Sequence, residues 1–250
     1  MGYAEYINQI SFKVLQPDVS VEEFLESNEW VKRAITSANA IRELEVMNTQ
    51  IPGDDDEDTK KLYEILNIPR MSSFAIAVII NKAVSLIPND LSFVNVGVWN
   101  GFTLLSGMTN NPEKICIGVD DFSQFGGPRK AFLGRFNKHK SPAHYFYDMD
   151  YREYFLKFHR GMIGAYLYDG DHSYENQFEG LRVAEPFFSD GCLVFVDDTN
   201  WSGPKSATLD FISQSANDYT ILLDKGTCHN RHPTFWNGIM VLQCKKVEKS

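Results

Sequence analysis

The chain has 250 residues, 43% of them hydrophobic, and a formal net charge of -9. This length suits one α/β domain with an elaboration, and the apolar content excludes a disordered chain. The acidic balance, without any dense Lys/Arg run, argues against a nucleic-acid partner. No leader with a basic and then an apolar region is visible, and the most apolar stretch, 74–87, is too short to span a bilayer. We therefore expect a cytoplasmic protein without a membrane partner.

Residues 1–70 are predicted to form a helical extension. Ser20 and Glu23 have the spacing of a capping box, in which each side chain bonds the other residue's backbone N–H. Apolar residues then recur at helical spacing, at Val31, Ile35, Ala38 and Ile41. Pro52 and Gly53 end this pattern, and the acidic run 54–58 is typical of a solvated loop. We expect the extension to form a lid over a site or a contact between copies of the chain.

Residues 71–250 are predicted to form an α/β domain. A helix over 74–87 ends at Pro88, and seven short runs with strand composition follow. The predicted strands span residues 92–97, 115–119, 144–147, 165–168, 192–196, 219–223 and 239–244. Helix-length segments separate the first six strands, which predicts a Rossmann-like, doubly wound, mostly parallel sheet. No clear helix separates the last two strands, so we expect the last strand to be reversed.

The four cysteines contain no CxxC pair, so their spacing indicates neither a zinc site nor a thioredoxin-like site. Cys116, Cys192 and Cys244 fall in predicted strands, whereas Cys228 does not. We interpret the cysteines as small buried apolar residues in a reducing compartment.

A turn with two glycines follows the first strand of the predicted sheet. Gly97 and Gly101 lie between the strand and the next helix, in the segment 95–103. Glycine lets the backbone approach a ligand closely, and a helix start offers free N–H groups. Trp99 stands where a GxGxxG motif has its second glycine, so an ordinary strand–helix turn is an equal alternative. The turn is a candidate cofactor site.

Asp120 ends the second predicted strand, about 20 residues after Gly101. An acid at this position can accept hydrogen bonds from the two hydroxyls of a ribose, as in dinucleotide-binding folds. The alternative is a helix cap, because acids are common at strand–helix turns. The spacing favours the ribose contact.

The strongest motif combines acids after two further strands. Asp169, Asp171 and His172 follow the fourth strand, and Asp197 and Asp198 end the fifth. The carboxyl ends of parallel strands share one edge of a sheet, so these four carboxylates are expected to converge there. Crowded carboxylates are costly unless a cation neutralises them, and oxygen ligands suit Mg²⁺, Ca²⁺ or Mn²⁺. The alternative is that each acid caps its own helix.

On these motifs, residues 91–244 resemble a class I S-adenosylmethionine (SAM)-dependent methyltransferase. The nearest group contains macrocin-type sugar O-methyltransferases, aminocoumarin O-methyltransferases and cephalosporin-hydroxylase-like proteins. The segments that carry the resemblance are 95–103, 118–121, 169–175 and 191–199. Residues 1–70 show no such resemblance, and that segment gives no indication of the acceptor.

The resemblance implies a cofactor, a metal and a base. SAM is expected over Gly97 and Gly101, with its ribose on Asp120 and its adenine beside Asp150. The residues implied to bind Mg²⁺ are Asp169, Asp197 and Asp198. Asp171 matches the general base of the group, and His172, which the sugar methyltransferases lack, is an alternative base. Asn95 stands where the family usually has an acid, which weakens attraction of the cationic cofactor.

The sequence therefore predicts methyl transfer from SAM to a hydroxyl of a small molecule, such as a sugar or natural product, assisted by a divalent metal. One alternative is a hydroxylase-like relative on the same scaffold, although iron chemistry usually needs two histidines and a carboxylate, and only His172 lies near the acids. Another is a non-catalytic SAM-binding module, against which the four retained carboxylates argue.

Overall fold

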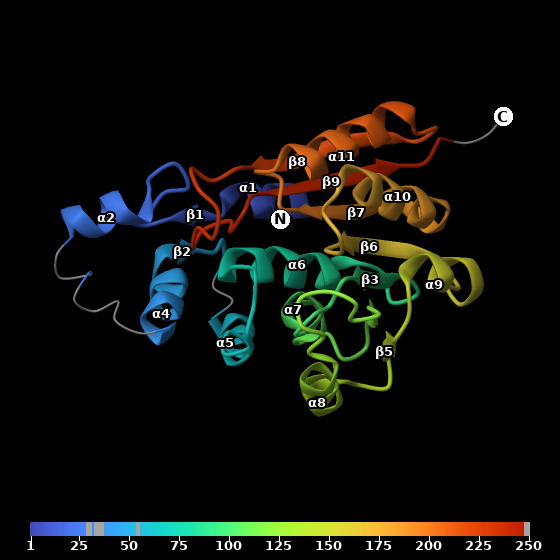
Figure 1. Ribbon diagram of the computed structural model, residues 1–250, viewed down its shortest axis with the longest axis horizontal. Helices are drawn as coiled ribbons and strands as arrows, with labels where there is room; N and C mark the ends of the chain where they lie inside the picture. The colour runs from blue at the N-terminus through green and yellow to red at the C-terminus, as the bar shows by residue number, and fades with distance from the viewer. Residues whose placement is uncertain (29–31, 33–37, 54–55, 248–250) are drawn as a thin grey trace.

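The computed structural model describes residues 1–28, 32, 38–53 and 56–247. Its centre is a seven-stranded sheet in the order β5-β4-β3-β6-β7-β9-β8 (Figure 1). The strands are β3 (Ser92–Val96), β4 (Ile115–Val119), β5 (His144–Tyr147), β6 (Ile163–Tyr168), β7 (Phe188–Asp197), β8 (Asp218–Lys225) and β9 (Ile239–Lys245). The strands from β5 to β7 pair in parallel. β9 is antiparallel to both of its neighbours. The predicted Rossmann-like sheet with a reversed last strand is confirmed.

Helices cover both faces of this sheet. They are α6 (Phe74–Leu86), α7 (Phe102–Met108), α8 (Arg129–His139), α9 (Tyr151–Lys157), α10 (Tyr174–Ala184) and α11 (Ser202–Gln214), with a 3₁₀ turn at Glu185–Phe187. Alternate side chains of a strand point to opposite faces. In β6, Ala165 and Leu167 accordingly join the core under α6 and α7. Tyr166 and Tyr168 join the core under α9, α10 and α11.

The N-terminal extension contains α1 (Tyr3–Gln9), β1 (Ser11–Phe12), α2 (Val21–Ser27), α4 (Ala38–Asn48), β2 (Thr49–Gln50) and α5 (Asp56–Ile65). Ser20 caps α2 as predicted, because its hydroxyl accepts from the Glu23 N–H. Val31 and Ile35, part of the predicted apolar periodicity, lie outside the described residues. The solvated-loop interpretation of 54–58 is wrong from Asp56 onward, where α5 begins. Acids in a first helical turn are favoured by the helix dipole.

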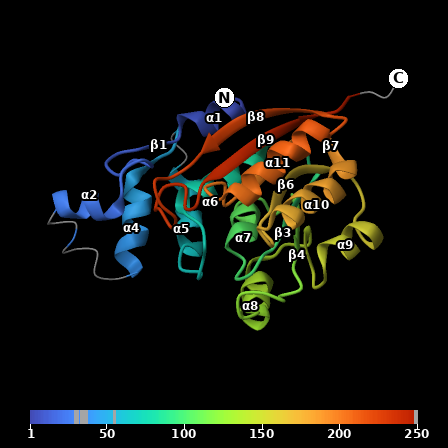
Figure 2. The same cartoon turned by 45° about the horizontal axis from the view of Figure 1, so that its top comes forward.

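The extension packs directly on the α/β domain. α1 lies beside β8 and α6, as Figure 2 shows. Its residues Tyr6 and Ile7 belong to the same core as α6. β1 and β2 form a separate antiparallel pair, which the sequence did not predict. In the part of the chain that the structure describes, no helix has both the length and the apolar character needed to cross a membrane.

A buried ion pair joins α4 to the segment before α6. Glu45 is 2% exposed, and its carboxylate accepts from Arg70 Nη2 at 2.7 Å and from the Phe74 N–H at 3.0 Å. Arg70 also donates to the backbone carbonyls of Leu66 and Ser72. Burial raises the pKa of Glu45 in spite of Arg70, so the carboxylate depends on these partners for its charge.

Glu45→Ala is expected to lower the free energy of unfolding by about 3–5 kcal/mol, because it leaves the Arg70 guanidinium buried without its partner. Chemical denaturation measures this change. Glu43 lies on the same helix but is exposed, so Glu43→Ala is the matched control and should change stability by less than about 0.5 kcal/mol. Equal losses in the two variants would contradict the role of the pair.

Candidate active site

A cavity of about 700 Å³ lies at the carboxyl edge of the sheet. The ends of β3, β4, β6 and β7 form its floor, together with the loops that follow them. Two further segments complete the wall: residues 70–72 before α6 and residues 230–237 before β9. All of the site residues predicted from the sequence line this cavity, except Asn95 and Gly101.

The glycine turn after β3 requires both of its glycines. Gly97 has φ 78°, and a Cβ there would lie 1.9 Å from the carbonyl oxygen of Asp169. Gly101 has φ 94°, and a Cβ there would lie 2.8 Å from the ring of Phe132. Trp99, in the place of the second GxGxxG glycine, also has a positive φ of 43°. The turn is therefore built by close backbone approach, which glycine alone permits.

Asp120 holds the glycine turn in place. Its Oδ2 accepts from the N–H groups of Val98 and Trp99 at 2.9 and 2.8 Å, and its Oδ1 accepts from the Phe122 N–H at 2.7 Å. Burial raises the pKa of this carboxyl, although these hydrogen bonds act in the opposite direction. A carboxylate offers about four acceptor positions, of which three are used here. Asp120 thus keeps room for about one ribose hydroxyl, where the sequence suggested two.

Asn95 is completely buried and faces its own turn. Its amide donates to the carbonyls of Val96 and Gly97, both at 3.2 Å, and its Oδ1 accepts from the Thr103 hydroxyl at 2.8 Å. These contacts brace the start of α7 against β3. Asp150, by contrast, lines the cavity and is the N-cap of α9, where it accepts from the N–H groups of Arg152 and Glu153.

Asp169, Asp197 and Asp198 gather at the ends of β6 and β7. Burial is the main cause that raises the pKa of Asp169, to about 6. Burial, then Asp169 and Asp198, raise the pKa of Asp197 further, and its carboxyl is in hydrogen-bond contact with that of Asp169. Asp197 Oδ1 is buried and has no partner among the described residues. Asp198 has φ 57° and accepts from the Asn237 amide at 2.7 Å.

His172 lies between two of these carboxylates. Its Nε2 is 3.6 Å from Asp169 Oδ1 and 3.5 Å from Asp198 Oδ2. Burial lowers the pKa of His172, but Asp169, Asp198 and Asp171 outweigh it, so the net pKa is raised. The imidazolium is thus a cation available within the chain itself. Among the described residues, one set of three side chains brings a possible metal-ligand atom from each within 4.8 Å of the others. That set lies in the loop before β9, so the carboxylates at the ends of β6 and β7 do not form such a set.

Asp171 differs from the other acids in its pKa. It is half-buried, and hydrogen bonds from Ser173, Gln124 and Asn176 lower its pKa to about 2. It accepts from the Ser173 N–H at 2.8 Å, immediately before α10. The helix-capping alternative is wrong for these acids within the described residues: Ser173 is the N-cap of α10, Asp171 lies just before it, and Asp169, Asp197 and Asp198 cap no helix.

Residues that are distant in sequence also position this group, and they were not predicted. Asn237 donates to Asp198 and accepts from the Arg231 N–H at 2.7 Å, so it fixes the loop 226–238 against the carboxylates. The ring of Trp201 meets that of His172 edge to face at 5.9 Å. These residues belong to segments without helical or strand periodicity, so only their polar and aromatic composition offered a signal.

The fold is that of class I SAM-dependent methyltransferases. Cofactor-bound Rv0187 from MTB is 11% identical, with a TM-score of 0.55 over 89% of this chain and 97% of that one. The O-methyltransferase from Bacillus cereus in complex with SAH is 10% identical, with a TM-score of 0.51 over 90% and 100%. No family model matches the chain, and no curated protein matches its sequence. At these identities the likeness establishes the fold.

Gly97→Ala is expected to destabilise the protein by at least about 2 kcal/mol more than Gly126→Ala, because the new Cβ would meet the backbone of Asp169. Gly126 has a similar φ of 77° but open space around its Cβ, so that variant measures the cost of the left-handed backbone alone. Urea denaturation of both variants gives the difference. Similar losses of stability in the two variants would show that the close approach of the glycine turn to Asp169 does not contribute to the free energy of unfolding.

Proposed function

We propose that the chain transfers the methyl group of SAM to a hydroxyl of a small-molecule acceptor, with a divalent cation at the carboxylate group. One observation carries this proposal: a single cavity contains both the Asp120-braced glycine turn and a buried set of carboxylates. The likeness to the folds of O-methyltransferases supports it. A sulfonium methyl is already activated, so the protein needs mainly to align the acceptor and deprotonate it.

The cofactor side of the cavity fits a nucleoside. Gly97 and Trp99 present backbone along the cavity wall, and Asp120 retains an acceptor position there. Asp150 lies on the same side, next to Tyr151. We place the ribose at Asp120 and the adenine toward Asp150. Asn95 is buried, and its side-chain amide and carbonyl groups are both hydrogen-bonded within the turn. It therefore makes no contact with the cationic end of the cofactor.

The buried acids fit a hard cation. Asp169, Asp197 and Asp198 offer only oxygen, which suits Mg²⁺. Asp197 Oδ1 lacks a partner, and the contact between Asp197 and Asp169 requires a shared proton or a cation. A bound cation would lower the pKa of an acceptor hydroxyl. The chain's own contribution is to hold these carboxylates in place through Asn237 and the end of β7.

His172 is the better candidate for the general base. A carboxylate with a pKa of about 2, such as Asp171, accepts a proton poorly from an alcohol, since a catalytic pKa works best near the operating pH. The pKa of His172 is raised above the usual value of about 6.5. Asp171 instead orders the turn into α10 through Ser173.

The acceptor side of the cavity combines aromatic rings and a cation. Trp201, Trp236 and Arg231 line it, and the Arg231 guanidinium forms no ion pair within the described part of the chain. Arg70 also lines it but is committed to Glu45. An acceptor with a ring, vicinal hydroxyls and an anionic group matches this lining. The hydroxylase alternative is less favoured, since His172 is the one histidine among the described residues that line the cavity.

Calorimetric titration is expected to show SAH binding in the micromolar range or tighter, and Asp197→Asn should leave it nearly unchanged.

Methyl transfer, screened on anionic and neutral polyhydroxylated acceptors, should fall on chelation in the wild type. Asp197→Asn should be slow with or without Mg²⁺, because its cation site is lost. Binding of a nicotinamide dinucleotide but not of SAH would contradict the cofactor, and full turnover in excess chelator would contradict the cation.

His172→Gln is expected to slow methyl transfer by about 10²–10⁴-fold, whereas Asp171→Asn should have a much smaller effect. A base must be neutral to accept a proton, so the wild-type rate should rise with pH as the His172 imidazolium loses its proton. The carboxylates raise the pKa of His172, so a cation that neutralises them should move this rise to lower pH. That rise should persist in Asp171→Asn and disappear in His172→Gln. A pH profile that changes only in Asp171→Asn would assign the base to Asp171 instead.

A further inference from the structure

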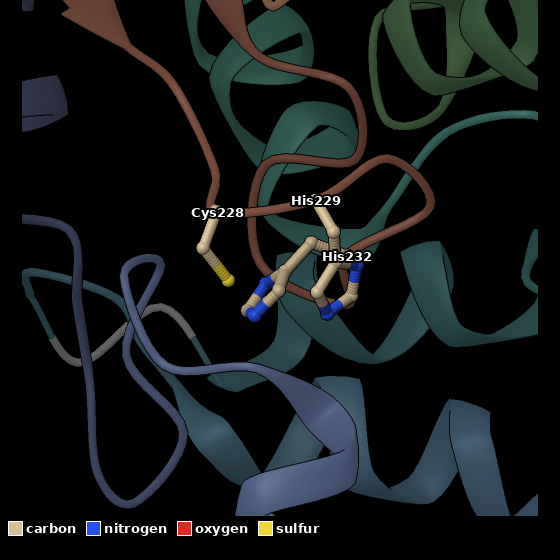
Figure 3. Close-up of side chains that lie close together, drawn as sticks. All are labelled: Cys228, His229 and His232. Carbon is tan, nitrogen blue, oxygen red and sulfur yellow. The ribbon is translucent and has the colours of Figure 1, made fainter.

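A second group of metal-ligand side chains lies in the loop between β8 and β9. Cys228, His229 and His232 each place one ligand atom within 4.8 Å of the others. Figure 3 shows the thiol and the two imidazole rings gathered on one side of this loop. None of the three lines the cavity, so the group is separate from the carboxylates of the candidate active site.

Both nitrogens of each imidazole ring have a partner, but the two rings have opposite roles, because in His229 Nε2 accepts from a backbone N–H, whereas in His232 Nδ1 does so. Each Nδ1 contacts the ring's own loop: His229 Nδ1 lies 2.9 Å from the Asn230 carbonyl, and His232 Nδ1 lies 2.7 Å from the Thr234 hydroxyl. Each Nε2 faces the N-terminal segment, where His229 contacts the Val21 N–H and His232 contacts the Val19 carbonyl. A second contact that fixes ring orientation is the usual arrangement of a metal-binding histidine.

The surroundings of the group favour a cation. Burial, and to a smaller extent the carboxylates of Glu23 and Asp18, raise the pKa of the Cys228 thiol. Asp18 also acts electrostatically on His232. The carboxylates of Glu23 and Asp18 thus make the potential at the thiol more negative, which favours a bound cation.

We propose that Cys228, His229 and His232 form a binding site for Zn²⁺, completed by water. One sulfur and two imidazole nitrogens make a donor set that zinc prefers and Mg²⁺ does not. Binding releases the thiol proton to solvent. At His229, Nε2 gives up the hydrogen bond from the Val21 N–H. At His232, the proton moves from Nε2 to Nδ1, where it faces the Thr234 hydroxyl. Both rings thus exchange a backbone contact with the N-terminal segment for a bond to the cation.

Such a site would stiffen the loop that forms part of the cavity wall. The backbone N–H of Cys228 already donates to the Pro17 carbonyl at 2.8 Å. The same loop carries Arg231 and Asn237, which line the cavity. A zinc ion held by three residues of this loop would therefore fix the acceptor side without touching the acceptor.

The test uses the full chain, freed of metal by chelation and then titrated with Zn²⁺ in excess Mg²⁺. We expect one equivalent to bind and to raise the thermal unfolding midpoint. Cys228→Ser and His229→Ala should each weaken binding by at least about 10–100-fold, the loss typical even for outer contacts of a metal site. His139→Ala, at an exposed histidine, is the matched control, and Asp197→Asn should bind zinc normally.

Co²⁺ serves as a second probe that reports the sulfur directly. The wild type should show a thiolate-to-cobalt charge-transfer band, and Cys228→Ser should lack it. The other cysteines, Cys116, Cys192 and Cys244, are buried and cannot supply the band without unfolding. Absence of zinc binding, binding that survives Cys228→Ser and His229→Ala, or a cobalt complex without the thiolate band would each overturn the proposal.

Discussion

Electrostatic repulsion between buried carboxylates is the constraint on which the site depends. The parallel sheet brings the ends of β6 and β7 side by side, so the half-buried Asp169 carboxyl lies next to the buried carboxyl of Asp197. Two ionised carboxyls in such a place repel strongly, so a proton, an imidazolium or a metal must compensate. His172 lies where it can compensate, between Asp169 and Asp198. The fold therefore carries a local charge that a bound cation would relieve.

The glycine turn and the carboxylates form one unit. Gly97 packs against the backbone carbonyl of Asp169, and the Asp169 N–H donates to the Val96 carbonyl at 2.9 Å. Asp120 ties the other side of the turn to the end of β4. Displacing the turn would consequently displace the first carboxylate of the group. In the proposed reaction, the distance between a methyl donor at the turn and an acceptor at the carboxylates would thus be set by backbone contacts, which deform little.

Strand composition and glycine spacing were sufficient to predict the sheet, the reversed strand and the cavity floor, because short apolar runs and the turn residues between them are local properties of the sequence. The bonds of Asp120 and Asn95 were not predictable, since their partners are set by tertiary packing. The pair β1–β2 consists of two residues on each side and carries no periodic signal. The group that contains Cys228 was not predicted. Its other members are histidines of the same loop, whereas the spacing rule considers pairs of cysteines.

The acceptor side of the cavity is built from segments outside the motifs that carry the resemblance. Ser73, next to the lining residues 70–72, donates its hydroxyl to the Thr234 carbonyl, and His232 contacts Val19. These bonds join the segment before α6 and the N-terminal extension to the loop before β9. Changes in either segment can alter which acceptor fits while the turn and the carboxylates keep their geometry. Acceptor choice is therefore physically separable from cofactor binding in this chain, and it depends on how firmly these two segments are held together.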